Sequence, residues 1–385
     1  MIHELRPEGS AQDRLAADRD DDVYERLARH LEVLAMGLPR NEVLLEVLRE
    51  TLTPFEAEIS LLLPTRVAPL QLVSVDEIAA AADMPREELA AVLEDMACRR
   101  LLFSGTTATG ERGYALLQSG FGFGEQRFLW GGDESPYAAK MVEMLMRYFR
   151  TDLQGEQYAS ATKPYRYIPV NTSLSVDMQA VLPFHTMEAV VRQAQRFAVA
   201  HCPCRMAAKI RGRACEHPIE VCLKFDELAD YLIERGLGRE VTRDEARDII
   251  KQSAEAGLVH FVDNAEGPVK HNCNCCGCSC WNVGAIRRRK IARDDIMATY
   301  FMRTTDDDAC VGCGVCLDIC PVQALTLEDD VAVVDEAWCI GCGLCVPRCA
   351  TGAAGLKQRA DRDSVPATGF RELHEQILRE KGLVP

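Results

Sequence analysis

The sequence predicts an α+β protein of several domains, on three observations. The chain has 385 residues, and at roughly 100–200 residues per domain this length fits two or three domains. Segments with the 3.6-residue spacing of helices alternate with short runs typical of strands. The 18 cysteines are unevenly placed: only Cys98 lies within the first 200 residues, and all the others lie between Cys202 and Cys349. The N-terminal half of the chain is therefore poor in cysteine and the C-terminal half is rich in it.

Composition limits the class of protein. Hydrophobic residues make up 48% of the chain, which is enough for ordinary buried cores and excludes a mainly disordered chain. The net charge of −15 disfavours binding to DNA or an anionic membrane through bulk charge. No apolar run approaches the ~20 residues of a spanning helix, and the N-terminus has no apolar signal segment. We expect a cytoplasmic protein without membrane insertion, whose reduced thiols serve metal or redox chemistry.

The front of the chain is predicted to be helical. Residues 1–21 are polar and rich in aspartate, and we expect a disordered lead-in there. Residues 22–130 form the first predicted domain, in which capping boxes at Thr53–Glu56 and Ser74–Glu77 each begin a helix. The predicted elements are helices from Tyr24 to Leu34, over 43–52, from Thr53 onward, over 75–82 and over 86–98, and strands over 101–104 and 113–117.

The end of this domain, two helices followed by two strands, resembles a winged helix-turn-helix. That resemblance implies either DNA binding or a protein-interaction role. Residues 1–130 contain 13 Arg, no Lys and 23 Asp or Glu, a net charge of −10. A helix that enters a DNA groove needs phosphate-neutralising charge around it. We therefore expect docking or a possible homodimer from this domain, and no nucleic acid partner. Cys98, at the end of helix 86–98, is expected to be a small buried core residue.

Residues 131–305 are predicted to form a mixed α/β, cysteine-rich domain. A methionine-rich stripe in its first helix is typical of core packing, and Thr242 is placed to cap a later one. The predicted elements are helices over 136–149, 187–195, 225–235, 243–255 and 287–300, and strands over 165–170, 197–200 and 258–262. Residues 357–385 are predicted to be a polar linker and an amphipathic C-terminal helix.

Two cysteine runs give the most specific signal. Residues 310–321 read CVGCGVCLDICP and residues 339–350 read CIGCGLCVPRCA, both with the spacing C-x2-C-x2-C-x3-C. This spacing lets one tight loop direct three thiolates at three corners of an iron–sulfur cube, while the glycines let backbone N–H groups approach sulfur. Zinc sites use four ligands, usually as two separated pairs, so two matching four-cysteine runs favour iron and sulfide.

Over residues 306–356 these runs resemble bacterial two-[4Fe-4S] ferredoxins, with a hairpin expected at 324–335. Ala350 departs from that pattern, because a proline usually follows the last cysteine. In that family the fourth cysteine of each run ligates the other cluster. The resemblance therefore implies two [4Fe-4S] clusters with crossed ligands: Cys310, Cys313, Cys316 and Cys349 for one, and Cys339, Cys342, Cys345 and Cys320 for the other.

Nine further cysteines form two patches that follow predicted strands. They are candidate metal ligands: Cys202, Cys204, Cys215, Cys222, Cys273, Cys275, Cys276, Cys278 and Cys280. Two cubes would use eight of them and bring the total to four clusters; a single patch holding zinc is the alternative. The simplest division is by patch, with the first four for one cluster and four of the later five for the other, although ligands shared across the patches remain open. His201, His217 and His271 adjoin these cysteines.

The order of parts over residues 22–356 resembles a family of long 4Fe-4S binding proteins of anaerobic bacteria. The residues concerned are the CPCR segment at 202–205, CEHPIEVCL at 215–223 and CNCCGCSC at 273–280, with Ser279 where that family's pattern has cysteine. Cys275-Cys276-Gly277 is also similar to the CCG motif of heterodisulfide reductase catalytic subunits. Motifs for nicotinamide, nucleotide or hydrolytic chemistry are absent from the sequence.

These patterns predict an iron–sulfur electron-transfer protein that passes single electrons to or from a partner oxidoreductase. We expect it to be a component of an oxidoreductase system rather than a stand-alone enzyme. One alternative is a reductase with an unusual substrate-binding cluster in the CNCC patch. Another is a redox-sensing regulator.

Overall fold

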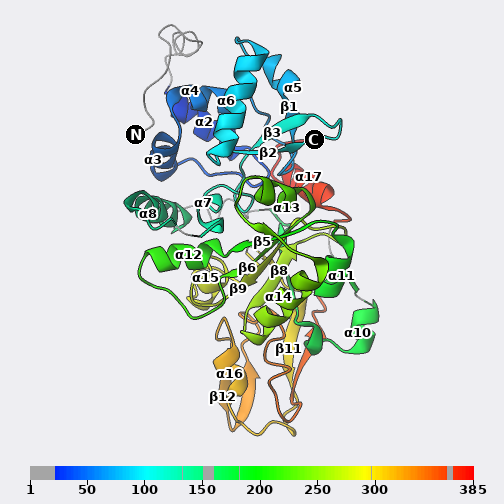
Figure 1. Ribbon diagram of the computed structural model, residues 1–385. Helices are drawn as coiled ribbons and strands as arrows, with labels where there is room; N and C mark the ends of the chain where they lie inside the picture. Colours follow the sequence, from blue (N-terminus) through cyan, green and yellow to red (C-terminus); the bar gives the residue numbers. More distant parts are fainter. Residues whose placement is uncertain (1–21, 132, 151–159, 182, 296, 362–366) are drawn as a thin grey trace. The chain divides into compact units, whose positions relative to one another are not determined.

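The computed structural model describes residues 22–131, 133–150, 160–181, 183–295, 297–361 and 367–385 (Figure 1). The predicted lead-in, 1–21, lies outside the described residues. By their contacts the described residues fall into two compact units, 22–124 with 143–150 and 382–385, and 125–142 with 160–381. Among the helices of these residues, none has the length and apolar character needed to cross a membrane.

The first unit contains the predicted helices and a small antiparallel sheet. Both capping boxes are confirmed: Thr53 and Ser74 accept from the backbone three residues on, and Glu56 and Glu77 accept in return. The sheet order is β1-β3-β2. The elements are α2 (Val23–Glu32), α3 (Glu42–Thr51), α4 (Pro54–Leu61), β1 (Val73–Ser74), α5 (Val75–Ala79), α6 (Arg86–Cys98), β2 (Leu102–Thr106) and β3 (Arg112–Leu116). The winged-helix character of this unit stays a prediction.

The prediction that Cys98 is a buried core residue is wrong. Helix α6 places Leu89, Leu93 and Met96 in the core, but Cys98 is its last residue and is exposed. Its Sγ atom lies 3.6 Å from Glu94 Oε1, on the polar side of the helix. A cysteine at the last position of a helix can match the helical spacing and still be exposed, because no further helical turn follows to pack over it.

The second unit is built on one sheet of seven strands, in the order β10-β4-β8-β9-β6-β5-β7, with only the β10–β4 pair parallel. The first elements are α7 (Gln126–Leu129), α8 (Pro136–Arg150, which continues into the first unit), β4 (Tyr165–Ile168), α10 (Val176–Val181), α11 (Met187–Gln193), β5 (Phe197–His201), α12 (Pro203–Ile210), β6 (Glu220–Phe225), α13 (Asp226–Glu234), β7 (Arg239–Glu240), α14 (Arg243–Glu255), β8 (Val259–Asp263), β9 (His271–Cys275), α15 (Val283–Arg287) and β10 (Met297–Ala298). Short 3-10 turns lie at Asn171–Ser173 and Pro183–His185.

The two faces of this sheet differ in chemistry. Helices α11 and α14 pack on one face over an apolar core that includes Val199, Val221 and Leu223. Side chains alternate between faces along a strand, so the neighbours of these residues point to the other side. That other face carries Cys222 from β6 and Cys273 and Cys275 from β9. The thiols of β6 and β9 therefore lie on the face opposite the apolar core, whereas Cys202 and Cys276 belong to that core.

The prediction of a helix over 287–300 is wrong. Helix α15 covers only Val283–Arg287, because Arg289 adopts a left-handed backbone with φ of 56°. The Arg289 guanidinium donates to the carbonyl of Val322 and lies 4.4 Å from the ring centroid of Trp338. The basic run after the second cysteine patch thus binds the segment that follows it.

The predicted ferredoxin-like segment belongs to the second unit. Its ends are joined by the antiparallel pair β11 (Phe301–Thr305) and β14 (Ala354–Gln358), and α16 (Val315–Ile319) lies in its first run. The predicted hairpin is confirmed as β12 (Leu325–Glu328) and β13 (Val331–Val334). In Figure 1 this segment, in orange, lies at one end of its unit. The predicted C-terminal helix is α17 (Phe370–Glu380), which docks through Leu373 and Ile377 on Ala265.

Candidate metal centres

Each cysteine run of the ferredoxin-like segment is shaped by two glycines with left-handed backbone. Their φ angles are 63° and 76° at Gly312 and Gly314, and 62° and 73° at Gly341 and Gly343. Such angles cost a residue with a side chain about 1–2 kcal/mol. At Gly341 a Cβ atom would also lie only 2.2 Å from the carbonyl oxygen of Phe301. The matched glycines explain why both runs fold into the same loop.

The structure brings Cys320, from the first run, to the thiols of the second. These four cysteines line one small cavity, together with Arg303: Cys320, Cys339, Cys342 and Cys345. Burial raises the pKa of the Cys345 thiol to about 12, and burial likewise raises the pKa of Cys342 well above its usual range. Four thiols that line one small cavity fit a site in which a cluster binds their thiolates.

The other set is more open to solvent: Cys313 is exposed, and Cys310, Cys316 and Cys349 are half-buried. Backbone N–H groups reach the sulfur atoms of Cys310 and Cys349. Ala332 donates to Cys310 Sγ over 3.4 Å. Burial of Cys349 is outweighed by hydrogen bonds from Thr351 and nearby backbone, which lower the pKa of its thiol. Donors aimed at sulfur stabilise thiolates and tune the potential of a cluster that they hold.

Residues 309–353 match the family model of the 4Fe-4S dicluster domain. This domain implies iron–sulfur electron transfer, and the chain's cysteines support 4Fe-4S clusters as its cofactors. Comparison of the chain with curated proteins and with solved structures gave no match. The match covers the dicluster segment alone, so the remaining cysteines have to be interpreted from their geometry.

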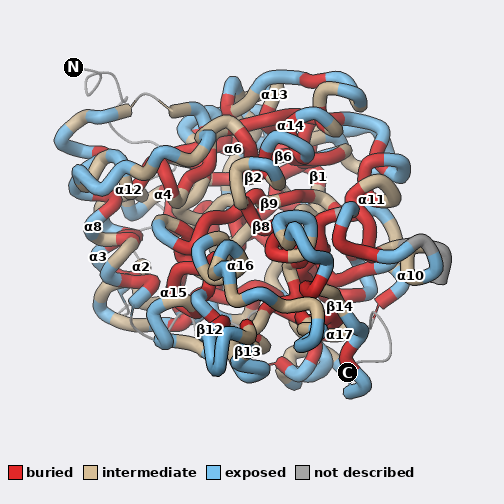
Figure 2. Tube along the Cα trace, turned by 90° about the horizontal axis from the view of Figure 1, so that it is seen from below, coloured by how far each residue is buried: buried red, intermediate tan, exposed pale blue. Residues whose placement is uncertain are grey.

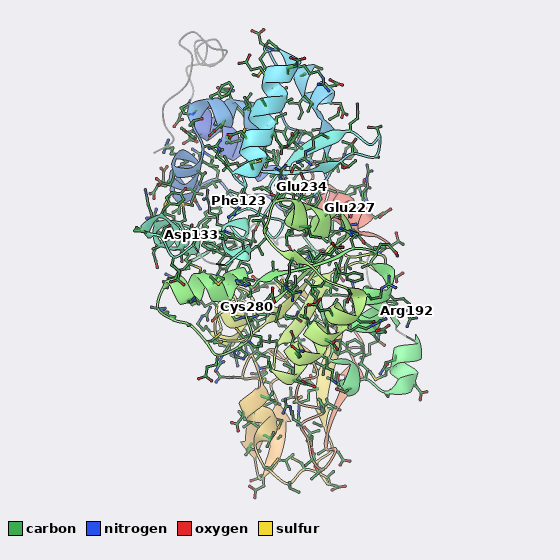
Figure 3. The ribbon with its side chains drawn as sticks, viewed as in Figure 1. Phe123, Asp133, Arg192, Glu227, Glu234 and Cys280 are labelled. Carbon is green, nitrogen blue, oxygen red and sulfur yellow. The ribbon has the colours of Figure 1, made fainter. Side chains whose placement is uncertain are left out.

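Six of the nine middle cysteines form one network of thiols, which we call the six-thiol network. Hydrogen bonds with Cys222 and Cys275 hold the pKa of Cys273 well below its usual range. Hydrogen bonds with Cys204 and Cys275 do the same for the pKa of Cys280, which is labelled in Figure 3. Cys204 in turn is hydrogen-bonded to Cys202. The members are Cys202, Cys204, Cys222, Cys273, Cys275 and Cys280.

Two buried cations face this network. Arg205 is 3% exposed and donates to the carbonyl of Asn274 over 3.2 Å from both terminal nitrogens. Burial alone would lower its pKa, but interaction with Cys202, Cys275 and Cys276 outweighs burial and raises it. Burial also opposes the charge of Lys224, whose pKa is nevertheless raised by Cys222 and Cys273. Buried cations are costly unless they face negative charge, so this site fits thiolates bound to a cluster.

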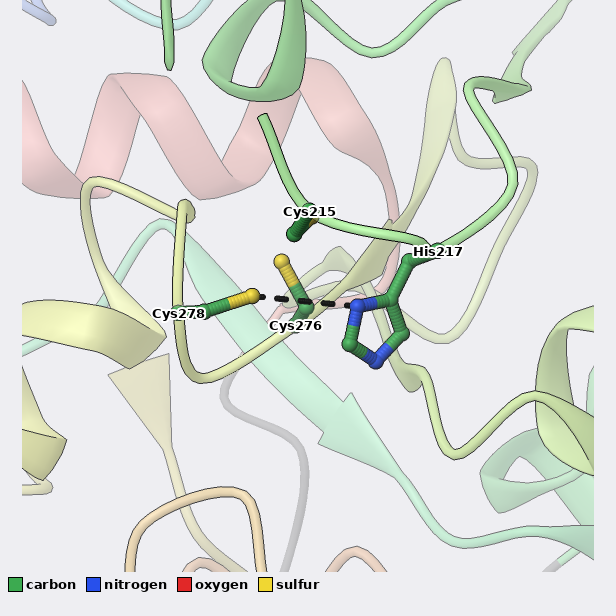
Figure 4. Close-up of side chains that lie close together, drawn as sticks. All are labelled: Cys215, His217, Cys276 and Cys278. Atoms are coloured by element: carbon green, nitrogen blue, oxygen red, sulfur yellow. Dashed lines mark hydrogen bonds between the residues drawn. The ribbon is translucent and has the colours of Figure 1, made fainter. Parts of the chain in front are cut away.

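The remaining three middle cysteines lie apart, with a histidine. We call Cys215, His217, Cys276 and Cys278 the Cys3His group; their ligand atoms all lie within 4.8 Å of one another. Figure 4 shows Cys276 and Cys278 on the loop after β9, facing Cys215 and His217 on the loop before β6. His217 Nδ1 lies 3.7 Å from Cys278 Sγ.

The structure therefore divides the nine cysteines differently from their order in sequence. The six-thiol network and the Cys3His group each contain cysteines from both sequence patches. The sequence alone left open whether ligands are shared across the patches in this way. Of the three candidate histidines, His217 joins the thiols. His271 is instead paired with Asp263, with Nδ1 3.0 Å from Oδ1, and the ring of His201 lies against Gly131.

The six-thiol network also approaches the dicluster segment. Burial raises the pKa of Tyr167 of β4 well above its usual range, and the Cys280, Cys275 and Cys342 thiols add to this shift. The loop after β9 packs tightly on the first run, since a Cβ atom on Gly277 would lie 1.9 Å from the carbonyl oxygen of Pro321. Arg293 donates to the carbonyl of Cys339 over 2.9 Å. These contacts hold the two cysteine-rich regions of the second unit together.

A cavity of about 660 Å³ also borders the second run. It is lined by apolar residues of α11 and α14, by the charged Arg348 and Glu188, and by Leu344, which lies between Gly343 and Cys345 of that run. Its base includes His260, whose pKa burial lowers to about 4. A molecule in this cavity would come within one residue of a predicted cluster ligand.

Sequence reasoning missed the residues that support the thiols. Arg205 directly follows Cys204, and Lys224 lies two residues after Cys222 on the same strand face. A cation beside a cysteine motif is the signal that could have found both. Ser279, noted only as a replaced cysteine, donates its backbone N–H to Cys276 Sγ over 3.4 Å.

Proposed function

We propose that this chain transfers single electrons between a low-potential donor and a partner oxidoreductase, through two ferredoxin-type [4Fe-4S] clusters. The observation that carries this proposal is the gathering of Cys320 with three thiols of the other run in one cavity. The ligand sets are the crossed ones: Cys310, Cys313, Cys316 and Cys349 for the first cluster, and Cys339, Cys342, Cys345 and Cys320 for the second. When bound, such clusters supply reversible one-electron chemistry.

We further propose that the six-thiol network holds a third cluster. Four thiols suffice for one cube, and the network offers six with two buried cations to offset their charge. The loop that carries Cys280 packs at Gly277 on Pro321 of the dicluster segment. This contact supports electron exchange between the network and the dicluster domain, which would connect the buried network to the surface.

The surface around the first run fits a partner with a basic rim and an apolar centre. Val311 and Val315, which flank Cys313, are 66% and 44% exposed, and Cys313 itself is exposed. Residues 304–347 contain no Lys or Arg and nine Asp or Glu, all exposed. Figure 2 shows most of β12 as exposed and α16 as exposed or intermediate. Acidic charge around an apolar centre steers a basic partner and then lets it dock.

The first unit serves, in this proposal, as a winged-helix-like module for docking or dimerisation of a cytoplasmic protein. DNA binding is disfavoured by how its arginines are engaged. Arg86 pairs with Asp76, and Arg99 pairs with Glu56 and Asp95. Arg112, from the strand pair, lies 3.1 Å from Glu94. Arginines paired with carboxylates offer little charge for neutralising phosphates.

Electron paramagnetic resonance on the anaerobically purified full chain tests this function. We expect a low-potential reductant to produce signals of reduced [4Fe-4S] clusters, and an oxidised basic redox protein to remove them at a rate that falls as salt increases. Asp306→Asn with Asp307→Asn should slow that step, whereas the same changes at Asp226 and Asp230, outside the segment, should not. Clusters that cannot be reduced, or oxidation insensitive to both salt and these changes, would overturn the proposal.

A further inference from the structure

The Cys3His group brings two short ligand pairs from two loops to one point. Cys215 and His217 are separated by one residue, and so are Cys276 and Cys278. Each pair comes from its own loop, and the four ligand atoms converge within 4.8 Å of one another (Figure 4). Two short pairs from two loops are the arrangement typical of a site for one tetrahedral ion.

Distances distinguish a single ion from a cube. Around one tetrahedral ion with sulfur at about 2.3 Å, the sulfur atoms lie about 3.8 Å apart, and a histidine nitrogen lies slightly closer. Cys278 Sγ and His217 Nδ1 are 3.7 Å apart. In a cube each thiolate binds its own iron, so the ligands have to spread around the whole cluster. The group is too compact for that spread.

Ser279 has two donors, its N–H and its hydroxyl, and the three sulfur atoms of the group all lie within their reach. Its N–H reaches Cys276 Sγ over 3.4 Å, and its hydroxyl reaches Cys215 Sγ over 3.4 Å and Cys278 Sγ over 3.8 Å. Donors that surround thiolate ligands fix their orientation and moderate their charge.

We propose that Cys215, His217, Cys276 and Cys278 bind one tetrahedral zinc ion, with His217 ligating through Nδ1. Three cysteines and one histidine are a zinc donor set, and four protein ligands leave no open position, which makes the site structural. The ion fixes the loop before β6 to the loop after β9. That second loop carries Cys280 of the six-thiol network and, at Gly277, packs on Pro321 of the dicluster segment. The zinc thus positions the loop between two redox regions without taking part in redox chemistry.

Metal analysis of the full chain, purified anaerobically and then supplied with excess iron and sulfide, tests the site. We expect about one zinc per chain to survive this treatment, because a closed site with four protein ligands offers no open position to incoming iron. Cys278→Ala should lose the zinc and keep the iron and sulfide of the wild type. Cys98→Ala, an exposed cysteine in the first unit, should lose neither.

A second pair of variants guards against simple misfolding. His217→Ala should lose zinc, whereas His217→Cys should retain it, because a fourth thiolate restores a complete donor set. Zinc replaced by iron on reconstitution, or a loss of about four iron atoms in Cys278→Ala, would show a cube at this position and overturn the proposal. Equal zinc content in His217→Ala and the wild type would also overturn it.

Discussion

The dicluster segment and the middle region both concentrate cysteines, but they assemble them in different ways. In the dicluster segment three ligands of each set lie on one short loop, shaped by paired left-handed glycines. In the middle region the thiols come from strands β6 and β9 and from loops far apart in sequence. Spacing alone identifies the first kind of site. The second kind depends on strand register, so its partition becomes visible only in the folded chain.

The largest expected contrast is in the loss of a single ligand. Cys320→Ala should remove about four iron atoms and four sulfides per chain, because each dicluster set has four thiols for one cube. Cys202→Ala should keep most of its iron, because five thiols of the six-thiol network remain. Iron and sulfide assays on both variants measure this, with Cys98→Ala as the control. Equal losses would mean that Cys202 is an indispensable ligand of the network's cube, which the other five thiols cannot replace.

A second contrast concerns the buried cation of the middle region. Arg205→Leu leaves thiolate charge uncompensated, and we expect a loss of unfolding free energy of about 3 kcal/mol and a more negative reduction potential for the network's cluster. Arg192→Leu, whose side chain is 74% exposed, should change neither. Anaerobic thermal unfolding and a redox titration measure the two effects. An unchanged reduction potential in Arg205→Leu would show that Arg205 does not lie close enough to a cluster to affect it.

Substitution of the glycines in the dicluster loops should have a smaller effect on stability, and Gly314 serves as the control for Gly341. Gly314→Ala meets no atom within 4 Å and should cost only the left-handed backbone, about 1–2 kcal/mol. Gly341→Ala adds the clash with the Phe301 carbonyl and should cost more and lower cluster occupancy. Thermal unfolding together with the visible absorbance of the clusters compares the two. The geometry of the second run would be contradicted if Gly341→Ala were the milder change.

The smallest predicted effect lies outside both cysteine regions, in the docked helix α17. Burial lowers the pKa of His374 to about 3, although Asp263 opposes the shift; Lys381 and His271 add to it. Because the folded pKa is depressed, the unfolded chain takes up the proton first. The stability from burying neutral His374 is therefore complete above pH 6.5 and falls toward pH 3, by at most about 1.4 kcal/mol per pH unit.

Unfolding of the wild type and His374→Met at pH 7 and 5.5 isolates this term. We expect the wild type to lose about 1–2 kcal/mol more than the variant over this interval. An identical pH dependence in the two proteins would show that His374 is not buried in its neutral form.

Much of the fold was readable from local signals. The capping boxes at Thr53 and Ser74, helix 86–98 and the hairpin between the cysteine runs are all found where the sequence places them. The errors lie where tertiary contacts determine where a helix ends or whether a side chain is buried. The helix predicted over 287–300 ends early because Arg289 turns to bind the next segment. Cys98 follows a helical pattern but sits at its exposed end.

The candidate site was predictable only in part: the sequence indicated the dicluster ligands but not how the middle cysteines divide. The dicluster runs carry their ligands in sequence order, and the family match agrees with them. The nine middle cysteines gave no partition, because Cys222 and Cys273 meet across neighbouring strands that are about fifty residues apart along the chain. Strand β9 itself was not predicted, since CNCC resembles a metal loop more than a strand. Because β9 was not predicted, the alternation of its side chains could not be used to predict which face of the sheet carries the thiols.

The most direct test of the account is the metal content of the anaerobically reconstituted full chain. Three cubes predict about 12 iron atoms and 12 sulfides per chain, and the Cys3His group predicts one zinc atom beside them. About eight iron atoms and eight sulfides would leave only the dicluster domain loaded and contradict the cluster proposed for the six-thiol network. About 16 of each without zinc would contradict the division of the middle cysteines into one cube and one ion.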